Sequence, residues 1–196
     1  MLLDANILAT FDALLTQARA TADPEPSAMA LGTAGIDGRV SVRQVLLKGH
    51  DTRGFVFHTH AGSRKGHQLA ENSRAALTFF WRHLPTPAQV RIEGDVEFVD
   101  DIDADVYFAT RPRERQIGAW ASDQSQTLSS REDFEARIAE VERRFAGTEV
   151  PRPTTWRGYR VRADMVEFWY AEFNRLHQRD CHEWHDGRWQ HRLLYP

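Results

Sequence analysis

Two cations, Arg43 and Lys48, bracket a short apolar run within the segment SVRQVLLKGHDTRGFVFHTHAGSRKGHQLAEN, residues 41–72. The run between them, residues 44–47, is rich in Val and Leu, which predicts a buried strand. Strict alternation along a strand would point the two cations to opposite faces. Either a bulge therefore intervenes or the two cations serve different groups.

The same segment contains a helix start with two cations beside it. Ser63 is placed to cap a helix over residues 65–72, and Arg64 and Lys65 follow it directly. The first turn of a helix leaves backbone N–H groups free, and with neighbouring cations these groups bind phosphate. The spacing indicates a phosphate site, and an ordinary solvated surface is the alternative.

A second group of cations surrounds Pro112, with Tyr107 and Arg111 before it and Arg113 and Arg115 after it. If Pro112 opens a helical turn, Arg111 and Arg115 lie near one another. Two guanidinium groups beside a tyrosine hydroxyl would hold a dianion well. The alternative is a solvated charged turn.

Two further stretches have polar side chains suited to a ligand. In the loop 120–125, the Gln124 amide could bind the amide edge of a heterocycle, although taken alone the stretch is better explained as an ordinary polar loop. Period-two spacing predicts that Arg175, His177 and Arg179 share one face of a strand. Three such side chains repel one another unless an anion or a π system faces them.

Metal binding is a competing interpretation of the C-terminal region. His177, Cys181, His182 and His185 are all capable ligands. Zinc sites use ligand pairs separated by a longer segment, whereas these residues would alternate across a hairpin. We therefore expect no metal site.

Periodicity and turn residues predict the elements that position these side chains. Ser129 and Glu132 form a capping box before the helix with the clearest pattern. Asp37-Gly38 and Asp186-Gly187 predict hairpin turns. We expect six to eight strands and about four helices, that is, a mainly β (α+β) fold with a closed antiparallel sheet and peripheral helices. The helices are predicted over 3–20, 65–72, 101–110 and 131–145; the strands over 27–34, 44–47, 55–59, 75–81, 89–99, 159–169 (interrupted near 163–164), 179–184 and 188–194.

Composition limits the classes of protein. We expect one domain over residues 1–196, with residues 1–25 forming an N-terminal helix and connector. A net charge of −3 predicts no general affinity for nucleic acid or anionic membranes. The single cysteine suits a reducing compartment, and no run of apolar residues is long enough to span a bilayer. We expect a cytoplasmic protein.

Several motifs occur in one order over nearly the whole chain from Pro26 to Pro196. The motifs are R-Q-V-L-L-K at 43–48, H-T-H-A-G-S-R-K at 58–65, Q-V-R-I-E-G at 89–94, Y-F-A-T-R-P-R at 107–113, Q-I-G-A-W-A-S at 116–122, Q-S at 124–125, E-F-W at 167–169 and R-L-H at 175–177. With this ordered set the chain resembles the pyridoxine (pyridoxamine) 5′-phosphate oxidases, flavoenzymes of the FMN-binding split-barrel fold.

The resemblance implies a homodimer with FMN at the subunit interface, and oxidation of pyridoxine or pyridoxamine 5′-phosphate to pyridoxal 5′-phosphate with O2 reduced to H2O2. It implies that Arg175 and His177 are catalytic, Arg175 against the reacting carbon and His177 orienting the substrate. The implied substrate set is Lys48, Tyr107, Arg111, Arg175 and His177, to which the spacing adds Arg115. The implied FMN set is Arg43, Gln44, Val45, Leu46, Leu47, Lys48, His58, Thr59, Arg64, Lys65, Gln89, Gln124, Ser125, Trp169 and Arg179, and Ser63 joins it as the helix cap.

The sequence departs from the family pattern at three places. Arg115 stands where the family usually has Ser, His58 stands where Tyr is common, and the N-terminus is short, so a substrate-covering arm is expected to be missing. Two alternatives follow. One is a related split-barrel flavin oxidase acting on another anionic heterocycle of the phenazine-precursor type, and the other is a flavin-binding module without turnover.

Overall fold

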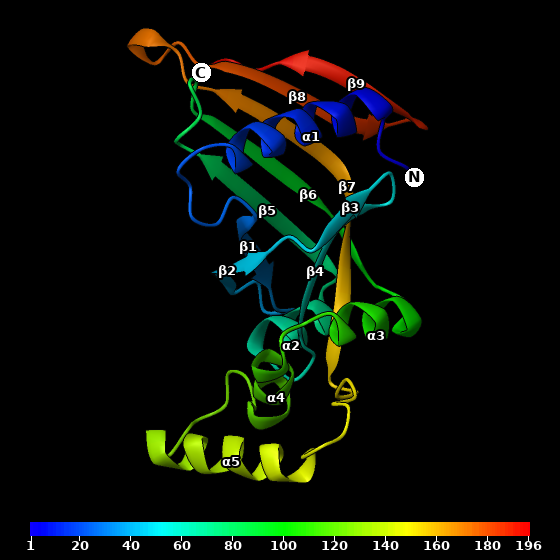
Figure 1. Cartoon of the computed structure of the whole chain (residues 1–196). Helices are drawn as coiled ribbons and strands as arrows, with labels where there is room; N and C mark the ends of the chain where they lie inside the picture. The colour runs from blue at the N-terminus through cyan, green and yellow to red at the C-terminus, as the bar shows by residue number, and fades with distance from the viewer.

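The computed structural model describes residues 1–196, and its centre is one antiparallel sheet that curls on itself (Figure 1). Its nine strands follow the order β2-β1-β5-β6-β7-β4-β3, with β8 added to β7 and β9 to β8. The strands are β1 Ala28–Ala34, β2 Val40–Leu46, β3 Gly49–Asp51, β4 Gly54–His60, β5 Arg74–Trp81, β6 Ala88–Phe98, β7 Trp156–Tyr170, β8 Gln178–His185 and β9 Arg188–Leu193. The helices are α1 Ala5–Arg19, α2 Arg64–Glu71, α3 Asp101–Ala109, α4 Arg113–Ala121 and α5 Arg131–Arg144, with a short 3-10 turn, η1, at Phe173–Arg175.

Helix α1 covers the concave face of the sheet. Alternation along β5 turns Leu77 and Phe79 inward, where neither is exposed to solvent. The Phe11 ring of α1 contacts Phe55 and Phe79 edge-on, at centroid distances of 4.9 and 5.2 Å. Full burial of a side chain of this size stabilises the fold by about 1.5–3 kcal/mol, so α1 is held by its apolar stripe.

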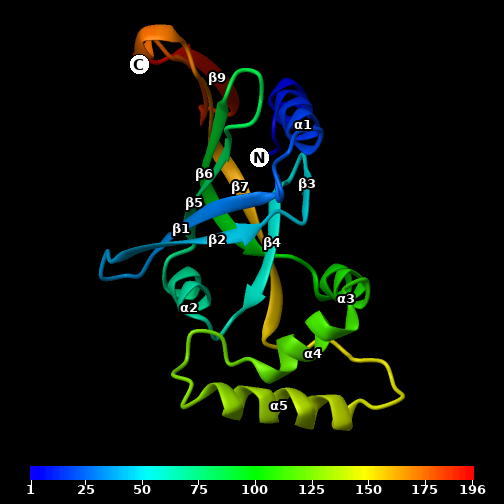
Figure 2. The ribbon, with the colours of Figure 1, turned by 60° about the vertical axis from the view of Figure 1, so that its left-hand side comes forward.

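The other helices lie at the end of the molecule away from β8 and β9 (Figure 2). Phe108 of α3 and Ile117 of α4 are buried in a second apolar cluster, with Phe145 just after α5 and Trp156 at the start of β7. This cluster holds α3 and α4 against the lower part of the sheet. It thereby fixes the turn at Pro112, which carries the second group of cations.

Strand β7 runs the full height of the sheet and connects its two ends (Figure 1). Its first part pairs with β4, and its second part, from Met165 to Tyr170, pairs with β8. The interruption that the sequence predicts near Ala163 is a bulge: Ala163 pairs with Gly94 and Met165 pairs with Glu93, so Asp164 is the extra residue. A Cβ on Gly94 would lie 2.0 Å from the Arg162 carbonyl oxygen, so this close approach requires glycine.

Most predicted elements are confirmed within two or three residues, and four details are wrong. The run 44–47 is not a fully buried strand, because β2 lies at one end of the sheet: Gln44 is exposed, Val45 and Leu46 are half-buried, and only Leu47, just after the strand, is buried. The cap of α5 is Ser130 rather than Ser129, since its hydroxyl accepts the Asp133 amide at 3.0 Å. The sheet has nine strands, and it is split rather than closed, because β2 and β3 end the strand order without pairing with each other. None of the helices is long and apolar enough to cross a membrane.

Candidate cofactor and substrate site

A hollow of about 750 Å³ lies between β2, β4, the start of α2 and the α3–α4 turn. Five cations line it, and no Asp or Glu does: Arg43, Lys48, Lys65, Arg111 and Arg115. None of the five forms an ion pair anywhere in the chain. Because a cluster of unpaired cations repels itself, the hollow is suited to a ligand with two or more negative charges.

The backbone brings Arg43 and Lys48 to the same hollow, although alternation along one strand would separate them. Strand β2 ends at Leu46, before Lys48 is reached. The Leu47 amide then donates to the Ser27 carbonyl at 2.9 Å, and the Lys48 amide donates to Val56 of β4 at 2.8 Å. The chain therefore crosses from β1 to β4 at this point. No bulge is needed to bring both cations to the hollow.

The surroundings of Lys48 lower the pKa of its side chain. Desolvation lowers the pKa of its ammonium group, Glu25 opposes that shift, and Arg115 and Arg111 add to it. The two arginines affect Lys48 only because the turn at Pro112 places them beside it. Arg111 and Arg115 line this same hollow on either side of the start of α4, which confirms the expectation that they lie near one another.

Lys65 is the most buried cation of the hollow, with 7% of its surface exposed. Its ammonium group donates to the Gln124 side-chain oxygen at 2.7 Å and to the Thr59 hydroxyl at 3.0 Å. Burial, with a smaller effect of Arg43, lowers the pKa of Lys65 to about 8. A buried ammonium group without a carboxylate is costly unless an anion completes the site.

The start of α2 has the predicted construction. The Ser63 hydroxyl accepts the Gly66 amide at 3.2 Å, as an N-cap does. Ser63 is fully buried and so acts on the helix rather than on the hollow. Arg64 and Ser125 line an adjoining hollow instead, which also contains Asp37 and Glu71.

Arg43 is held from the sheet side. Its Nη1 donates to the Leu31 carbonyl at 3.0 Å and to the Thr33 hydroxyl at 2.7 Å, both on β1. Burial lowers its pKa, and so does the nearby Arg64. Gln44, Val45 and Leu46 also line the hollow, whereas Leu47 is buried in the core.

His58 lies in an aromatic stack at the wall of the hollow. Its ring is 4.4 Å from the Tyr107 ring and 4.7 Å from the Trp156 ring, with interplanar angles of 22° and 10°. Burial first, then Arg111, Lys48 and Arg152, lower its pKa to about 4, so the imidazole is neutral at ordinary pH. Both ring nitrogens are buried without a hydrogen-bond partner.

Arg111 continues this stack, because its guanidinium lies 4.6 Å from the Trp156 ring centre, and its Nη1 is also buried without a partner. Orphaned donors beside free cations fit a phosphorylated heterocycle that supplies the acceptors. The sequence interpretation missed Trp156. A lone aromatic residue at the start of a strand carries no signal beyond ordinary core packing.

The remaining predicted residues lie at the other end of the sheet. Gln89 pairs with Trp169, and Trp169 pairs with Arg179, so these three form one row across β6, β7 and β8. We call them the cross-strand row. Because it is built from cross-strand partners, the three side chains share one face of the sheet.

Arg175 and His177 are not on a strand, which corrects the expectation that they share a strand face with Arg179. Arg175 ends the turn η1, and β8 begins only at Gln178. Asn174 and Arg175 have φ angles of 56° and 61° and so reverse the chain into an exposed tip. His177 Nδ1 accepts the Glu172 amide at 3.2 Å, and its ring lies 4.5 Å from that of Trp169.

One chain does not bring the hollow and the cross-strand row together. His58 pairs with Gly158, whereas Trp169 stands eleven residues farther along β7. At about 3.3 Å per residue, this is roughly 36 Å along the strand. Figure 1 shows the same separation: the tip before β8 lies near the C-terminus, and α2 and α4 lie at the opposite end.

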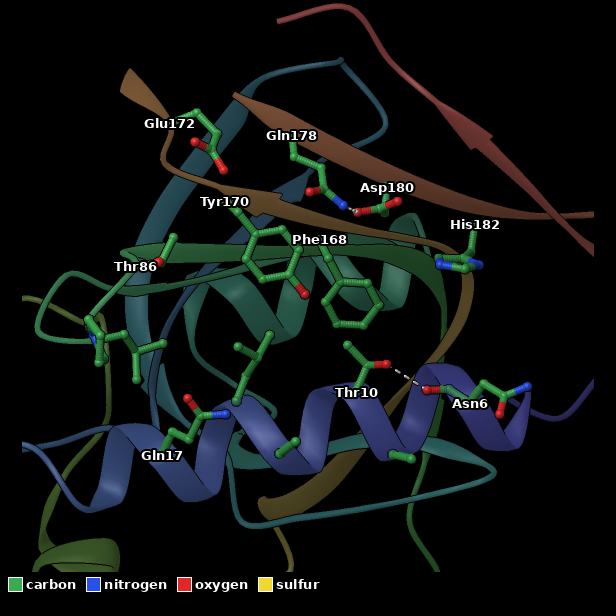
Figure 3. A pocket seen from close by; sticks show the side chains of 15 residues that line it. Asn6, Thr10, Gln17, Thr86, Phe168, Tyr170, Glu172, Gln178, Asp180 and His182 are labelled. Carbon is green, nitrogen blue, oxygen red and sulfur yellow. Dashed lines mark hydrogen bonds between the residues drawn. The ribbon is translucent and has the colours of Figure 1, made fainter. Parts of the chain in front are cut away.

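A larger groove, of about 900 Å³, runs between α1 and the strands β7 and β8 (Figure 3). Phe168 and Tyr170 point into it, and no Lys or Arg lines it, whereas Glu172 and Asp180 do. These carboxylates would repel a phosphate, so the smaller cationic hollow is the candidate site. His182 faces this groove, while Cys181 lines the opposite face of the sheet.

Comparison with known proteins agrees with this geometry. Residues 15–145 match the family model described as pyridoxamine 5′-phosphate oxidase, and residues 156–196 match the pyridoxine 5′-phosphate oxidase C-terminal dimerisation region. The pyridoxine/pyridoxamine 5′-phosphate oxidase of Xanthomonas euvesicatoria is 54% identical over 98% of both chains. That of Sphingopyxis alaskensis is 53% identical over 96% of this chain and 87% of its own.

Solved structures show the same fold. PhzG from Burkholderia lata, in complex with tetrahydrophenazine-1-carboxylic acid, has a TM-score of 0.90 and 33% identity, covering 96% of this chain and 92% of its own. An FMN-binding protein from Nostoc punctiforme superposes with a TM-score of 0.74 at 15% identity, over 96% of both chains. The family models and the near-full-length relatives at 53–54% identity agree with each other and with the split sheet. The chain belongs to the pyridoxamine 5′-phosphate oxidase family.

Proposed function

We propose that this protein is an FMN-dependent oxidase that makes pyridoxal 5′-phosphate. Pyridoxine 5′-phosphate and O2 give pyridoxal 5′-phosphate and H2O2; with pyridoxamine 5′-phosphate, water is also consumed and ammonia released. Relatives of this name cover nearly the whole chain at 50–54% identity. The observation that carries the proposal is the hollow with five unpaired cations and no carboxylate.

The cations divide into two groups, which suits two phosphates. Arg43 and Lys65 lie at the β1 and α2 side, where Lys65 also contacts Gln124. We assign these residues and the α2 start to the FMN phosphate and its neighbouring polar atoms. Bound FMN supplies an acceptor for a hydride equivalent and a route for its electrons to O2.

Lys48, Tyr107, Arg111 and Arg115 form the second group, which we assign to the substrate phosphate. The neutral His58 ring stacks on Tyr107, and neither of its nitrogens has a hydrogen-bond partner in the chain. These residues bind and orient the substrate, which makes the transfer between two bound molecules effectively intramolecular. The main contribution of this second group of residues is therefore to hold the substrate phosphate in place.

A second copy of the chain completes the site in this proposal. Trp169 and Arg179 of the cross-strand row, with Arg175 and His177, belong to the region that matches a dimerisation model, residues 156–196. They do not reach the hollow of their own chain, since about eleven residues of β7 intervene. In a homodimer, the tip of one protomer would enter the hollow of its partner, with Arg175 against the reacting carbon and His177 orienting the substrate.

One specific observation favours a second candidate. PhzG, a relative with the same fold, was crystallised with a carboxylated phenazine precursor, and Arg115 would give this hollow a guanidinium to meet a carboxylate. A carboxylated heterocycle as substrate would use the same flavin site. Its lower identity of 33%, against 54% for the vitamer oxidases, makes it the second choice.

Aerobic turnover of the FMN-loaded protein tests the proposal. Pyridoxine 5′-phosphate should yield pyridoxal 5′-phosphate, followed by its absorbance, with one H2O2 for each product molecule. Flavin reduction by a reduced phenazine carboxylate but not by either vitamer would favour the second candidate. If FMN binds but neither compound reduces it, the protein is a flavin-binding module without turnover.

A further inference from the structure

We propose that Glu167 is a positioning residue, whose carboxylate holds the Arg179 guanidinium in the orientation that meets FMN. The inference rests on the proposed function, because it takes Arg179 as a contact of the flavin bound by the partner subunit. Glu167 itself touches neither FMN nor substrate. Its effect should therefore pass entirely through Arg179.

The Glu167 carboxylate is buried against the sheet, and each of its two oxygens accepts a hydrogen bond from an arginine. Only 2% of the residue is exposed. Its Oε1 accepts from Arg179 Nε at 2.6 Å, and its Oε2 accepts from Arg91 Nη1 at 2.8 Å. Because charge-assisted bonds at these distances are directional, the carboxylate fixes the plane of the guanidinium.

The register explains why this carboxylate can reach Arg179. Arg91, Glu167 and Cys181 are cross-strand partners, and they form the row next to Gln89, Trp169 and Arg179. Residues two apart on a strand share a face, so both rows face the same side of the sheet. Glu167 is therefore the diagonal neighbour of Arg179, one row behind the residues assigned to the flavin.

A second contact holds Arg179 from the C-terminus. Its Nη1 donates to the Tyr195 carbonyl at 3.0 Å, and its own carbonyl accepts the Leu194 amide at 3.0 Å. Nε and Nη1 are thus both engaged, and Nη2 donates to no protein atom. A guanidinium held at two nitrogens presents the third in a fixed direction to an acceptor atom of a ligand.

The two arginines depend on Glu167 to different extents. Arg91 keeps another carboxylate when Glu167 is neutralised, because its Nη2 also donates to Glu93 at 2.7 Å. Arg179 has no ion pair except the one with Glu167. Loss of the Glu167 charge should therefore release Arg179 and leave Arg91 bound.

Titration of the apoprotein with FMN tests the proposal without relying on turnover. Glu167→Gln keeps the size of the side chain and removes its charge, and we expect it to weaken FMN binding roughly 10-fold. Arg179→Ala should weaken binding by at least as much. The double variant should bind FMN no more weakly than Arg179→Ala alone, because a residue that acts through Arg179 has nothing left to position.

Two further variants separate positioning from stability. Glu183→Gln breaks a comparable pair on the same face of the sheet, where Arg192 donates to Glu183 at 3.0 and 2.9 Å, and should leave FMN affinity unchanged. Glu167→Asp keeps the buried charge, and therefore the fold, but withdraws the carboxylate by one methylene. It should give an intermediate loss of affinity.

The proposal is overturned if Glu167→Gln weakens FMN binding by the same factor with and without Arg179, since that result indicates general damage to the sheet. Wild-type affinity in both Glu167→Gln and Glu167→Asp, or in Arg179→Ala, would also overturn it. The proposed function is tested separately, on the unmodified protein: it fails if the FMN-loaded protein does not oxidise the vitamers, whatever the variants do to FMN affinity.

Discussion

The Lys65 ammonium group donates to the Gln124 side-chain oxygen at 2.7 Å, although the two residues are 59 positions apart in the sequence. The contact joins the start of α2 to the loop after α4. It also occupies the Gln124 oxygen, which accepts from Thr59 at 2.8 Å as well, so the Gln124 amide nitrogen is left for a ligand. Lys65 therefore links the phosphate site to the group that we expect to bind the flavin ring.

FMN affinity should fall as the pH rises through about 8, whereas riboflavin affinity should not. The pKa of Lys65 is lowered to about 8 in the folded apoprotein, so its ammonium group is present below this pH and lost above it. Between pH 7 and 9 the protonated fraction falls roughly 10-fold, and the phosphate loses its partner in proportion. Apoprotein titrations with both ligands at several pH values measure this.

Lys65→Met is the matched variant for that experiment. It should reduce the preference for FMN over riboflavin, since Arg43 and the start of α2 remain, and it should remove the pH dependence near pH 8. Equal affinities for the two ligands in the unmodified protein would show that the phosphate site is assigned to the wrong residues.

Mixed dimers should recover activity from two inactive variants. Arg111→Ala damages the hollow, and Arg175→Ala damages the tip. If each site takes its hollow from one protomer and its tip from the partner, every mixed dimer has one intact site, so random reassortment gives roughly a quarter of wild-type turnover. Turnover is measured after joint refolding, with each variant refolded alone as the control. No recovery would place both groups in one protomer's site.

Arg115→Ala should raise the KM for pyridoxine 5′-phosphate roughly 10- to 100-fold, the effect of losing one charge-assisted bond of about 1.5–3 kcal/mol. Arg115 lines the hollow, has no carboxylate partner and lies close enough to Lys48 to affect its pKa. FMN affinity should not change. Arg131→Ala, on the exposed face of α5 beside Glu135, is the control. An unchanged KM would show that Arg115 does not contact the phosphate.

Arg175→Ala should lower kcat strongly and leave the flavin spectrum and FMN affinity unchanged. Arg175 stands in the exposed tip with a φ of 61°, outside the cross-strand row. Stopped-flow flavin reduction under anaerobic conditions isolates the step in which it is expected to act. A variant that loses FMN instead would move Arg175 into the cofactor site.

Local patterns predict much of this fold. Asp186-Gly187 forms the predicted hairpin because both residues adopt positive φ angles, 51° and 80°, as a tight turn requires. Ser63 caps α2 because a hydroxyl just before a helix can accept a free amide of the first turn, here that of Gly66. Such features depend on neighbours within four residues, which a sequence displays directly.

Long-range pairing sets the remaining features, and these have no local signature. The edge position of β2 follows from the strand order rather than from the composition of residues 44–47. Arg175 and His177 have period-two spacing with Arg179, yet the chain leaves the sheet after Tyr170 and returns only at Gln178. The ordered motifs indicated the members of the site, but they could not show that one chain divides them into two separate groups.

The extra residue at Asp164 has a consequence for the whole site. Before it, odd-numbered residues of β7 such as Tyr159 and Val161 face the core; after it, even-numbered residues such as Val166 and Phe168 do. If Asp164 instead took part in regular alternation, with no bulge, odd-numbered residues would go on facing the core, and Trp169 and Glu167 would point at α1. The bulge in β7, and not the chemistry of any one side chain, therefore determines which face of the sheet presents these residues to a flavin.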